Sequence, residues 1–254
     1  MIQLSIRDLG LHFGGLTALN EITLDINKGD LIAVIGPNGA GKTCLLNCIT
    51  GFYRAQQGVI DFEEHEIGRL PPHRISRLGI GRTFQNLELF RDTTVLENLL
   101  LARHMHFSYG LFSSLAFYGR ARNQEVAHRR VVEEIIDFLE IQSITKKLVH
   151  ALPYGLQKRV ELGRALALEP SLLLLDEPMA GMNIEEKEDI VRFIVETNEV
   201  KGITTILVEH DLPVVMDISS RICVLDFGIK IAEGSPEEVS KDPQVIKAYF
   251  GESA

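Results

Sequence analysis

The chain has 254 residues, of which 45% are hydrophobic and 24% are charged, a composition typical of a globular protein with a substantial core. Its net charge of −9 argues against a general nucleic-acid-binding protein, which normally carries a basic excess. The longest apolar runs fall short of the roughly 18 to 20 residues that cross a bilayer, and the amino terminus lacks the pattern of a signal peptide. We therefore expect a cytosolic chain with one compact domain, or one domain with a sub-domain.

The cysteines do not show a metal-binding or redox spacing. Cys44, Cys48 and Cys223 form neither a CxxC nor a CxxxH pattern. Because a cytosolic chain keeps its thiols reduced, we interpret all three as packing residues.

The amino-terminal third predicts a sheet followed by a strand-loop-helix unit. Residues 4–26 mix alternating hydrophobic and polar positions with a turn at Gly14-Gly15, which predicts an antiparallel sheet. Residues 31–35 (LIAVI) form a short unbroken apolar run, typical of a fully buried strand. A glycine-rich turn leads from it into a helical segment, 42–50, which Gly51 closes.

The central part predicts helices, and the segments after it predict a parallel sheet. Residues 93–168 show almost only helical patterns, which indicates a helical sub-domain inserted into an α/β core. The apolar runs LLLLLD and TTILVEHD then predict two more buried strands, with an amphipathic helix over 185–198 between them. Strand, helix and strand in this order are typical of βαβ architecture.

The carboxyl-terminal segment predicts a hairpin and two short helices. Residues 221–234 favour the hairpin, and Pro236 and Pro243 each suit the first turn of a helix.

One motif in the first third predicts a phosphate site. Residues 36–43, GPNGAGKT, fit the pattern G-x-x-x-x-G-K-[ST] and lie between a buried strand and a helix, the context that gives the pattern meaning. Lys42 should neutralise the β and γ phosphates, and the Thr43 hydroxyl should bind Mg²⁺. The alternative is an ordinary glycine turn that caps a helix. The predicted nucleotide contacts here are Gly36, Pro37, Asn38, Gly39, Ala40, Gly41, Lys42, Thr43 and Cys44.

Two acidic residues at the end of the next buried strand complement this loop. Asp176 follows four leucines and would hold Mg²⁺, directly or through water, while Glu177 would orient or deprotonate an attacking water. Alone, this pair would fit a solvated turn better. Together with the phosphate loop, it predicts hydrolysis of a nucleoside triphosphate.

With these motifs in place, essentially the whole chain resembles the ATP-binding cassette (ABC) family. The resemblance implies an α/β fold: a P-loop NTPase (RecA-like) core with an N-terminal antiparallel β sub-domain and an inserted helical sub-domain. The β sub-domain and core would comprise residues 1–92 and 164–254, and the helical sub-domain would comprise about 93–163.

The resemblance also implies roles for three further residues. Gln85 in GRTFQNLELF matches the family's Q-loop glutamine, which contacts the metal, and His210 matches the switch histidine at the γ-phosphate. Phe13 lies where the family stacks an aromatic ring on adenine. Without the resemblance, these would be read as a surface glutamine, a structural histidine and a core aromatic residue. The catalytic residues would be Lys42, Gln85, Glu177 and His210, and the metal ligands Thr43, Gln85 and Asp176.

Two family motifs depart from their usual sequence. The signature LSGGQ is replaced by LPYGL, residues 152–156, and Pro153 lacks the serine hydroxyl that would bind the γ-phosphate held by the opposite subunit. Gly155 remains and could still bring its backbone N–H to that phosphate. In the D-loop, Asn183 of AGMN replaces an aspartate at the expected dimer interface.

Several segments resemble one branch, the ATP-binding subunit of branched-chain amino acid importers. These are the YG pair of the signature, AGMN, GIGRTFQNLELF, TVLENLLLARH, VIKAYFGE, and a stretch between His104 and Arg130 similar in size to that branch's insertion. The branch implies an ATPase that uses ATP and Mg²⁺ with a second cassette, either itself or a sister chain. Permease subunits would dock on the helical sub-domain at the cytoplasmic face of the inner membrane, and a periplasmic or extracellular binding protein would take part indirectly. No nucleic acid is implied.

Three other functions stay open at this point. A related cassette could serve another cargo, through urea or amide uptake or lipopolysaccharide export, although the exporter usually keeps an LSGGE-like signature. A cassette of DNA repair or translation usually has a coiled coil, zinc cysteines or a second cassette, none of which the sequence contains. An adapter that binds ATP without hydrolysing it is disfavoured by Lys42, Asp176, Glu177 and His210.

Overall fold

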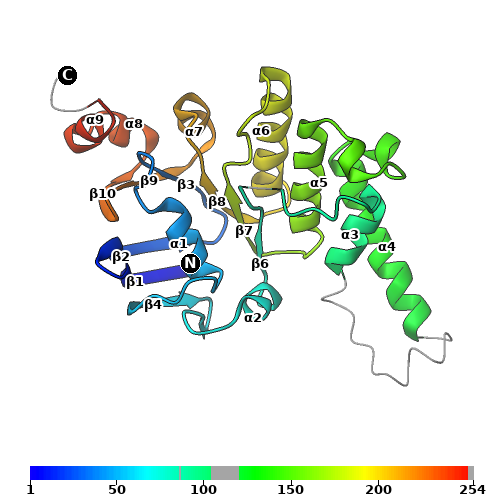
Figure 1. Cartoon of the computed structure of the whole chain (residues 1–254), viewed down its shortest axis with the longest axis horizontal. Coiled ribbons are helices and arrows are strands. Elements are labelled where there is room, and N and C mark those ends of the chain that lie inside the picture. Colours follow the sequence, from blue (N-terminus) through cyan, green and yellow to red (C-terminus); the bar gives the residue numbers. More distant parts are fainter. Residues whose placement is uncertain (86, 104–119, 251–254) are drawn as a thin grey trace.

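The computed structural model describes residues 1–85, 87–103 and 120–250 and contains two β-sheets with helices packed around them (Figure 1). The first sheet is antiparallel, with the strand order β2-β1-β4-β5. The predicted hairpin forms β1 (Ile2–Phe13) and β2 (Leu16–Asn27), joined at Gly14 and Gly15.

The sequence analysis missed the other two strands of this sheet, β4 (Gln57–Phe62) and β5 (His65–Glu66). Strand β4 is short and lacks regular alternation. Its Gly58 has a φ of 86°, and a Cβ there would lie 2.5 Å from the carbonyl oxygens of Arg7 and Asp8 in β1. Glycine weakens the strand pattern in the sequence, but here it permits the close approach of two backbones.

The second sheet has the order β10-β9-β3-β8-β7-β6. Its strands are parallel except β10, which pairs antiparallel with β9. Every residue of the predicted buried strands is buried, as hydrophobic runs covered on both faces should be. The strands are β3 (Leu31–Ile35), β6 (Ile80–Arg82), β7 (Leu172–Asp176), β8 (Thr204–Val208), β9 (Arg221–Asp226) and β10 (Ile229–Gly234).

Helix α1 (Lys42–Ile49) follows β3 after the loop of residues 36–41 and packs between the two sheets. Its Leu45, Leu46 and Ile49 belong to one apolar cluster with the inner face of the antiparallel sheet and one face of the parallel sheet. The other face is covered by helices that include α6 (Ile184–Glu199). The remaining helices of this part are α2 (Pro72–Arg77), α7 (Leu212–Ile218), α8 (Pro236–Ser240) and α9 (Pro243–Phe250).

Helices α3 (Val95–Arg103), α4 (Arg120–Phe138) and α5 (Tyr154–Leu166) lie together at one end of the molecule, beyond β6 (Figure 1). They pack closely at Gly163, where a Cβ would lie 2.9 Å from a methyl of Leu139 and 3.0 Å from one of Leu99. Two short 3₁₀ turns, Gln142–Ile144 and Val149–Ala151, connect α4 with α5. None of the helices in the described ranges is long and apolar enough to cross a membrane.

The cysteines serve as packing residues, as the sequence analysis predicted. Cys48 and Cys223 are buried in the cluster around α1, and all three thiols are free. Burial raises the pKa of Cys48 and of Cys223 to about 12, so both thiols remain protonated at neutral pH.

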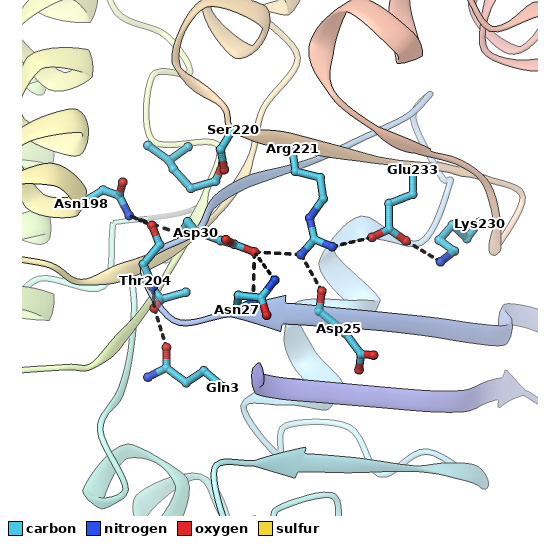
Figure 2. A network of polar contacts seen from close by, with 12 residues as sticks. Gln3, Asp25, Asn27, Asp30, Asn198, Thr204, Ser220, Arg221, Lys230 and Glu233 are labelled. Atoms are coloured by element: carbon cyan, nitrogen blue, oxygen red, sulfur yellow. Dashed lines mark hydrogen bonds and ion pairs between the residues drawn. The ribbon is translucent and has the colours of Figure 1, made fainter. Parts of the chain in front are cut away.

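A polar network joins the two sheets at the amino ends of β3, β8 and β9 (Figure 2). Arg221 of β9 donates to Asp30 (2.9 Å) and to Glu233 of β10 (2.8 Å). Asn198 of α6 donates to the carbonyl oxygens of Gly29 and Ile203, each at 3.0 Å. The network holds the turn between β2 and β3 against the parallel sheet. It lies at the opposite end of the strands from the residues described next.

Candidate functional site

The predicted phosphate loop follows the carboxyl end of β3 and packs tightly against neighbouring backbone. Gly36 has a φ of 148°, and a Cβ there would lie 2.0 Å from the carbonyl oxygen of Leu225 in β9. Gly41 has a φ of 102°, and its Cβ would lie 2.7 Å from the carbonyl oxygen of Ala18. At Gly39, by contrast, a Cβ would meet nothing within 4 Å. The loop therefore needs glycine at its two ends for packing and is open at its middle.

The loop presents the amino terminus of α1. No side chain caps this helix at Gly41, and the first intrahelical bond runs from the N–H of Leu45 to the carbonyl of Gly41 (2.9 Å). The N–H groups of Lys42, Thr43 and Cys44 precede that bond, so the helix itself offers them no acceptor. Such N–H groups, together with the helix dipole, form an anion site suited to phosphate.

Lys42 lies over the loop and is only 6% exposed. Its ammonium donates to the carbonyl oxygens of Gly36 (2.7 Å) and Pro37 (3.0 Å), which leaves one of its three donors for a ligand. Burial lowers the pKa of Lys42, and the charges of Glu177 and Asp176 oppose that shift. The two carboxylates therefore act on the same ammonium that would meet the phosphates.

Asp176 ends β7 and is 1% exposed. Its Oδ1 lies 3.5 Å from the hydroxyl of Thr43 in α1, and its Oδ2 accepts a hydrogen bond from Arg82 at 2.9 Å. The structure thus brings two predicted metal ligands face to face. Arg82 was not identified from the sequence, because an arginine three residues before Gln85 does not form a recognisable motif.

Glu177, His210 and Gln85 form one hydrogen-bonded group. Nε2 of His210 lies 2.7 Å from one carboxylate oxygen of Glu177, and Nε2 of Gln85 donates to the other at 3.0 Å. The residues come from the end of β7, the end of β8 and the loop after β6. Three residues predicted as catalytic are therefore in direct contact, and both oxygens of the carboxylate are fixed in place.

Glu209 is a site residue that the sequence analysis missed. It is 4% exposed, and its carboxylate accepts hydrogen bonds from the N–H groups of Met179 and His210, each at 2.9 Å. Burial raises its pKa, and these two bonds oppose that shift. Glu209 thus joins the segment after Glu177 to the histidine. Its sequence signal was an acidic residue directly before His210 at the end of a buried strand.

A buried ion pair on α5 holds the backbone that carries Gln85. Lys158 donates to Glu161 (3.1 Å) and to the carbonyl oxygens of Phe84 (3.3 Å) and Gln85 (3.2 Å). Glu161 accepts a hydrogen bond from the N–H of Phe84 at 3.2 Å. Both side chains are almost fully buried. The helix that starts at the altered signature is therefore connected to the Gln85 loop through Lys158 and Glu161.

Phe13, the predicted adenine contact, is exposed at the end of β1. The residue is 45% exposed, and its ring packs edge-on against Tyr53, with 5.1 Å between ring centroids. A ring that remains this exposed retains a free surface for stacking, in contrast to the alternative reading as a core aromatic residue.

The altered signature lies at the start of α5. Pro153 precedes α5, and its side chain makes no cap. Gly155 packs against Glu186 of α6, where a Cβ would lie 2.3 Å from a carboxylate oxygen. Asn183 caps α6 by a capping box with Glu186, with its side chain accepting from the N–H of Glu186 at 2.9 Å.

The donor set near Thr43 fits Mg²⁺. It comprises the Thr43 hydroxyl and the Asp176 carboxylate, and hard cations prefer such oxygen ligands. The amide of Gln85, the third predicted ligand, donates to Glu177. No group of three or more His, Cys, Asp or Glu side chains that could hold a metal lies within residues 1–85, 87–103 and 120–250. A single carboxylate is nevertheless typical of a site where Mg²⁺ binds together with substrate phosphates.

The glycine loop lies over the amino terminus of a helix. A strand of the same parallel sheet ends at Asp176, and Glu177 follows it directly. These two features define the class of P-loop nucleoside triphosphatases. Comparisons with known proteins narrow this class. Residues 19–180 match the model of the family described as ABC transporter, and residues 230–254 match one described as branched-chain amino acid ATP-binding cassette transporter.

Curated relatives and solved structures resemble the chain over nearly its whole length. The high-affinity branched-chain amino acid transport ATP-binding protein LivG of Salmonella typhimurium is 40% identical, covering 98% of both chains. BraF of Pseudomonas aeruginosa, with the same description, is 41% identical over the same shares. The ADP conformation of the ABC transporter cassette MJ1267 superposes with a TM-score of 0.85 at 33% identity, covering 99% of this chain and 100% of that one. The chain therefore belongs to the ABC transporter family and has the fold of its ATP-hydrolysing cassettes.

Proposed function

We propose that this chain hydrolyses ATP to power the uptake of branched-chain amino acids through separate permease subunits, with Lys42, Gln85, Glu177 and His210 as its catalytic residues. The observation that carries the reaction is the contact of Glu177 with both His210 and Gln85 beside the phosphate loop. The cargo is supported by the match of residues 230–254 to the branched-chain model and by the descriptions of LivG and BraF.

Binding of ATP would start at the phosphate loop. The N–H groups of residues 42–44 and the remaining donor of Lys42 would hold the phosphates, with Gly36, Pro37, Asn38, Gly39, Ala40 and Gly41 shaping the loop. Phe13 would stack on the adenine ring. Bound Mg²⁺, held by Thr43, Asp176 and Gln85, would neutralise phosphate charge that develops during the reaction.

Hydrolysis would use the carboxylate of Glu177 as the base. Water attacks the γ-phosphorus, the bond from that phosphorus to the β–γ bridging oxygen breaks, and ADP leaves with the bonding electrons. Glu177 takes up the water proton, while His210 and Gln85 hold the carboxylate in place. His210 would also contact the γ-phosphate and so register its loss.

The working unit would contain two cassettes, with each nucleotide lying between one phosphate loop and the other chain's signature helix. The second cassette is a copy of this chain or a sister chain. Pro153 offers no hydroxyl to that nucleotide, so the backbone N–H of Gly155 and the amino terminus of α5 would provide the contact.

The permease would dock between the core and a helical sub-domain of about residues 93–163. A groove with a cavity volume of about 440 Å³ lies there, lined by residues of α2, β6, α3 and α5. Its lining is largely apolar, and Phe84 in its wall is adjacent to Gln85. We propose a helix of a permease subunit as its occupant, because the Gln85 loop would then connect docking with the carboxylate of Glu177. The chain would act at the cytoplasmic face of the inner membrane, and a periplasmic or extracellular binding protein would deliver the cargo.

Uptake of labelled leucine by the native cells tests this proposal. A chromosomal Lys42→Ala substitution should abolish energised uptake, because phosphate binding is lost, and should leave an unrelated importer unaffected. The matched control is Lys28→Ala, which changes an exposed lysine in the turn before β3 and should preserve uptake. Normal uptake in the Lys42→Ala strain, after other leucine carriers have been deleted, would refute the branched-chain cargo and favour amides, other amino acids or an exported lipid.

A further inference from the structure

We propose that Arg82 is a positioning residue that sets Asp176 and Thr43 in place for Mg²⁺. The inference rests on the proposed nucleotide function and adds a residue to that site. Arg82 ends β6, and its side chain is 6% exposed. It is therefore a buried arginine beside a buried carboxylate.

The guanidinium of Arg82 joins the two elements that carry the predicted metal ligands. Its Nη2 donates to Oδ2 of Asp176 in β7 at 2.9 Å. Its Nη1 donates to the side chains of Asn47 in α1 (2.7 Å) and of Thr50 directly after α1 (3.0 Å). Thr43 lies in the first turn of the same helix. One rigid planar group thus fixes the helix that carries Thr43 relative to the strand that carries Asp176.

The same contacts orient the carboxylate. Because Arg82 occupies Oδ2, Oδ1 is the oxygen that faces the Thr43 hydroxyl, 3.5 Å away. Rotation of the carboxylate would break a charge-assisted hydrogen bond inside the protein, where the remaining partner would be left buried and uncompensated. Arg82 therefore holds the pair of ligand oxygens in one arrangement before a metal binds.

Simple packing does not account well for this arginine. Its Nε is buried and has no hydrogen-bond partner among the described residues, which is costly for a structural side chain. The guanidinium also packs on the ring of Phe84, 5.0 Å from the centroid, next to Gln85. Arg82 thus contacts the strand, the helix and the loop that contribute predicted metal ligands. Groups that orient metal ligands in this way typically change metal affinity by 10- to 100-fold when removed.

The test is a titration of the purified chain with Mg²⁺ in the presence of a fluorescent ATP analogue. Arg82→Met should leave analogue binding in EDTA within about twofold of wild type, because the phosphate loop remains intact. It should raise the Mg²⁺ midpoint, the Mg²⁺ concentration that gives half of the fluorescence change, by roughly 10- to 100-fold. Mn²⁺ binding, followed by electron paramagnetic resonance, should weaken in parallel. An unchanged Mg²⁺ midpoint would overturn the inference.

Asn47→Ala is the matched control, since it removes one bond to the same guanidinium but keeps the Arg82–Asp176 pair. Its Mg²⁺ midpoint should shift much less than that of Arg82→Met, because Thr50 still binds Arg82. Equal shifts in the two variants would assign the effect to the packing of α1 and overturn the inference.

Two further measurements keep the test decisive. If Arg82→Met does not fold, Arg82→Lys takes its place, because lysine keeps the positive charge but cannot hold α1 and Asp176 together. A Mg²⁺ midpoint raised several-fold in Arg82→Lys supports the inference, and an unchanged midpoint overturns it. A wild-type chain that binds no nucleotide would instead refute the proposed function. Failure of the inference therefore requires normal, Mg²⁺-dependent binding by wild type and the same midpoint in the Arg82 variants.

Discussion

Glu177 has a backbone conformation that non-glycine residues rarely adopt, with a φ of 49°. Its N–H donates to the carbonyl oxygen of Val208 at 2.9 Å, which ties the strained residue to the end of β8. Strain of this kind persists where the surroundings determine the position of a side chain, and it is concentrated at functional sites. Here it directs the carboxylate toward His210 and Gln85.

A Glu177→Gln substitution should lower the rate of ATP hydrolysis by roughly 10²- to 10⁴-fold, because the amide cannot accept the water proton. Nucleotide affinity should change little, since the phosphate loop is untouched. Phosphate release and analogue binding measure the two quantities. Glu185→Gln, an exposed acidic residue in the first turn of α6, is the control and should hydrolyse ATP normally. Near-normal turnover by Glu177→Gln would refute the role of this carboxylate as the base.

The phosphate loop contains two glycines with different requirements. Gly36→Ala should destabilise the protein by about 2 to 4 kcal/mol, because the Cβ would overlap the carbonyl of Leu225 at a left-handed φ. Gly39→Ala also places alanine at a positive φ, 83°, but meets no atom within 4 Å and should cost only about 1 to 2 kcal/mol. Urea denaturation of both variants measures the difference. Equal losses would show that the overlap with β9 relaxes at little cost.

At the scale of elements, α5 connects the altered signature with the Gln85 loop through its Lys158–Glu161 pair. Burial raises the pKa of Glu161 despite the attraction of Lys158. A raised pKa in the folded state means that the folded protein holds this proton more tightly than the unfolded chain. The stability contributed by Glu161 is therefore fully present below the unfolded pKa of about 4.3 and is lost as the pH rises through the folded pKa.

Glu161→Gln should remove this dependence, because glutamine does not titrate. The free energy of unfolding of the variant relative to wild type should therefore increase as the pH is raised from about 4 toward neutrality. Urea unfolding of both proteins at several pH values measures this slope. Glu185→Gln, the same change at an exposed position, serves as the control. A flat or falling difference for Glu161→Gln would mean that the carboxylate is not destabilised by burial.

For the whole molecule, the network in Figure 2 links α6, the turn before β3 and the start of β8 on the side away from the nucleotide site. Asn198 uses one amide to bind three carbonyl oxygens, those of Gly29, Asp30 and Ile203. A single side chain thus satisfies backbone acceptors from two separate loops, which lets these loops lie against one another.

Asn198→Ala should lower the free energy of unfolding by about 1 to 3 kcal/mol, because partly buried acceptors lose their donor. ATP affinity should remain unchanged, because the network lies at the amino ends of the strands and the phosphate loop at their carboxyl ends. Thermal unfolding and analogue binding test the two statements. The neighbouring exposed Glu199→Ala should affect neither. Weakened nucleotide binding in Asn198→Ala would show that the two ends of the sheet are coupled.

Features that depend on short sequence spans could be predicted from the sequence. The strands β3, β7 and β8 are recognisable because full burial requires unbroken apolar runs. The phosphate loop is recognisable because its glycines and Lys42 act within eight consecutive residues. Strand β4 was missed because it pairs with β1, a partner distant in the chain. Strand β5 pairs with the neighbouring β4 and was missed because two residues are too few to give a strand pattern.

The sequence by itself determined the reaction class of this protein, since each of its motifs is local and chemically specific. Only the tertiary structure decided which side chains support those motifs. Arg82 binds Asp176, Glu209 binds the N–H of Met179, and Lys158 binds the carbonyl oxygen of Gln85, and each of these contacts joins residues far apart in the chain. Their identity follows from burial, because a charged group removed from water must find a partner wherever the fold places one.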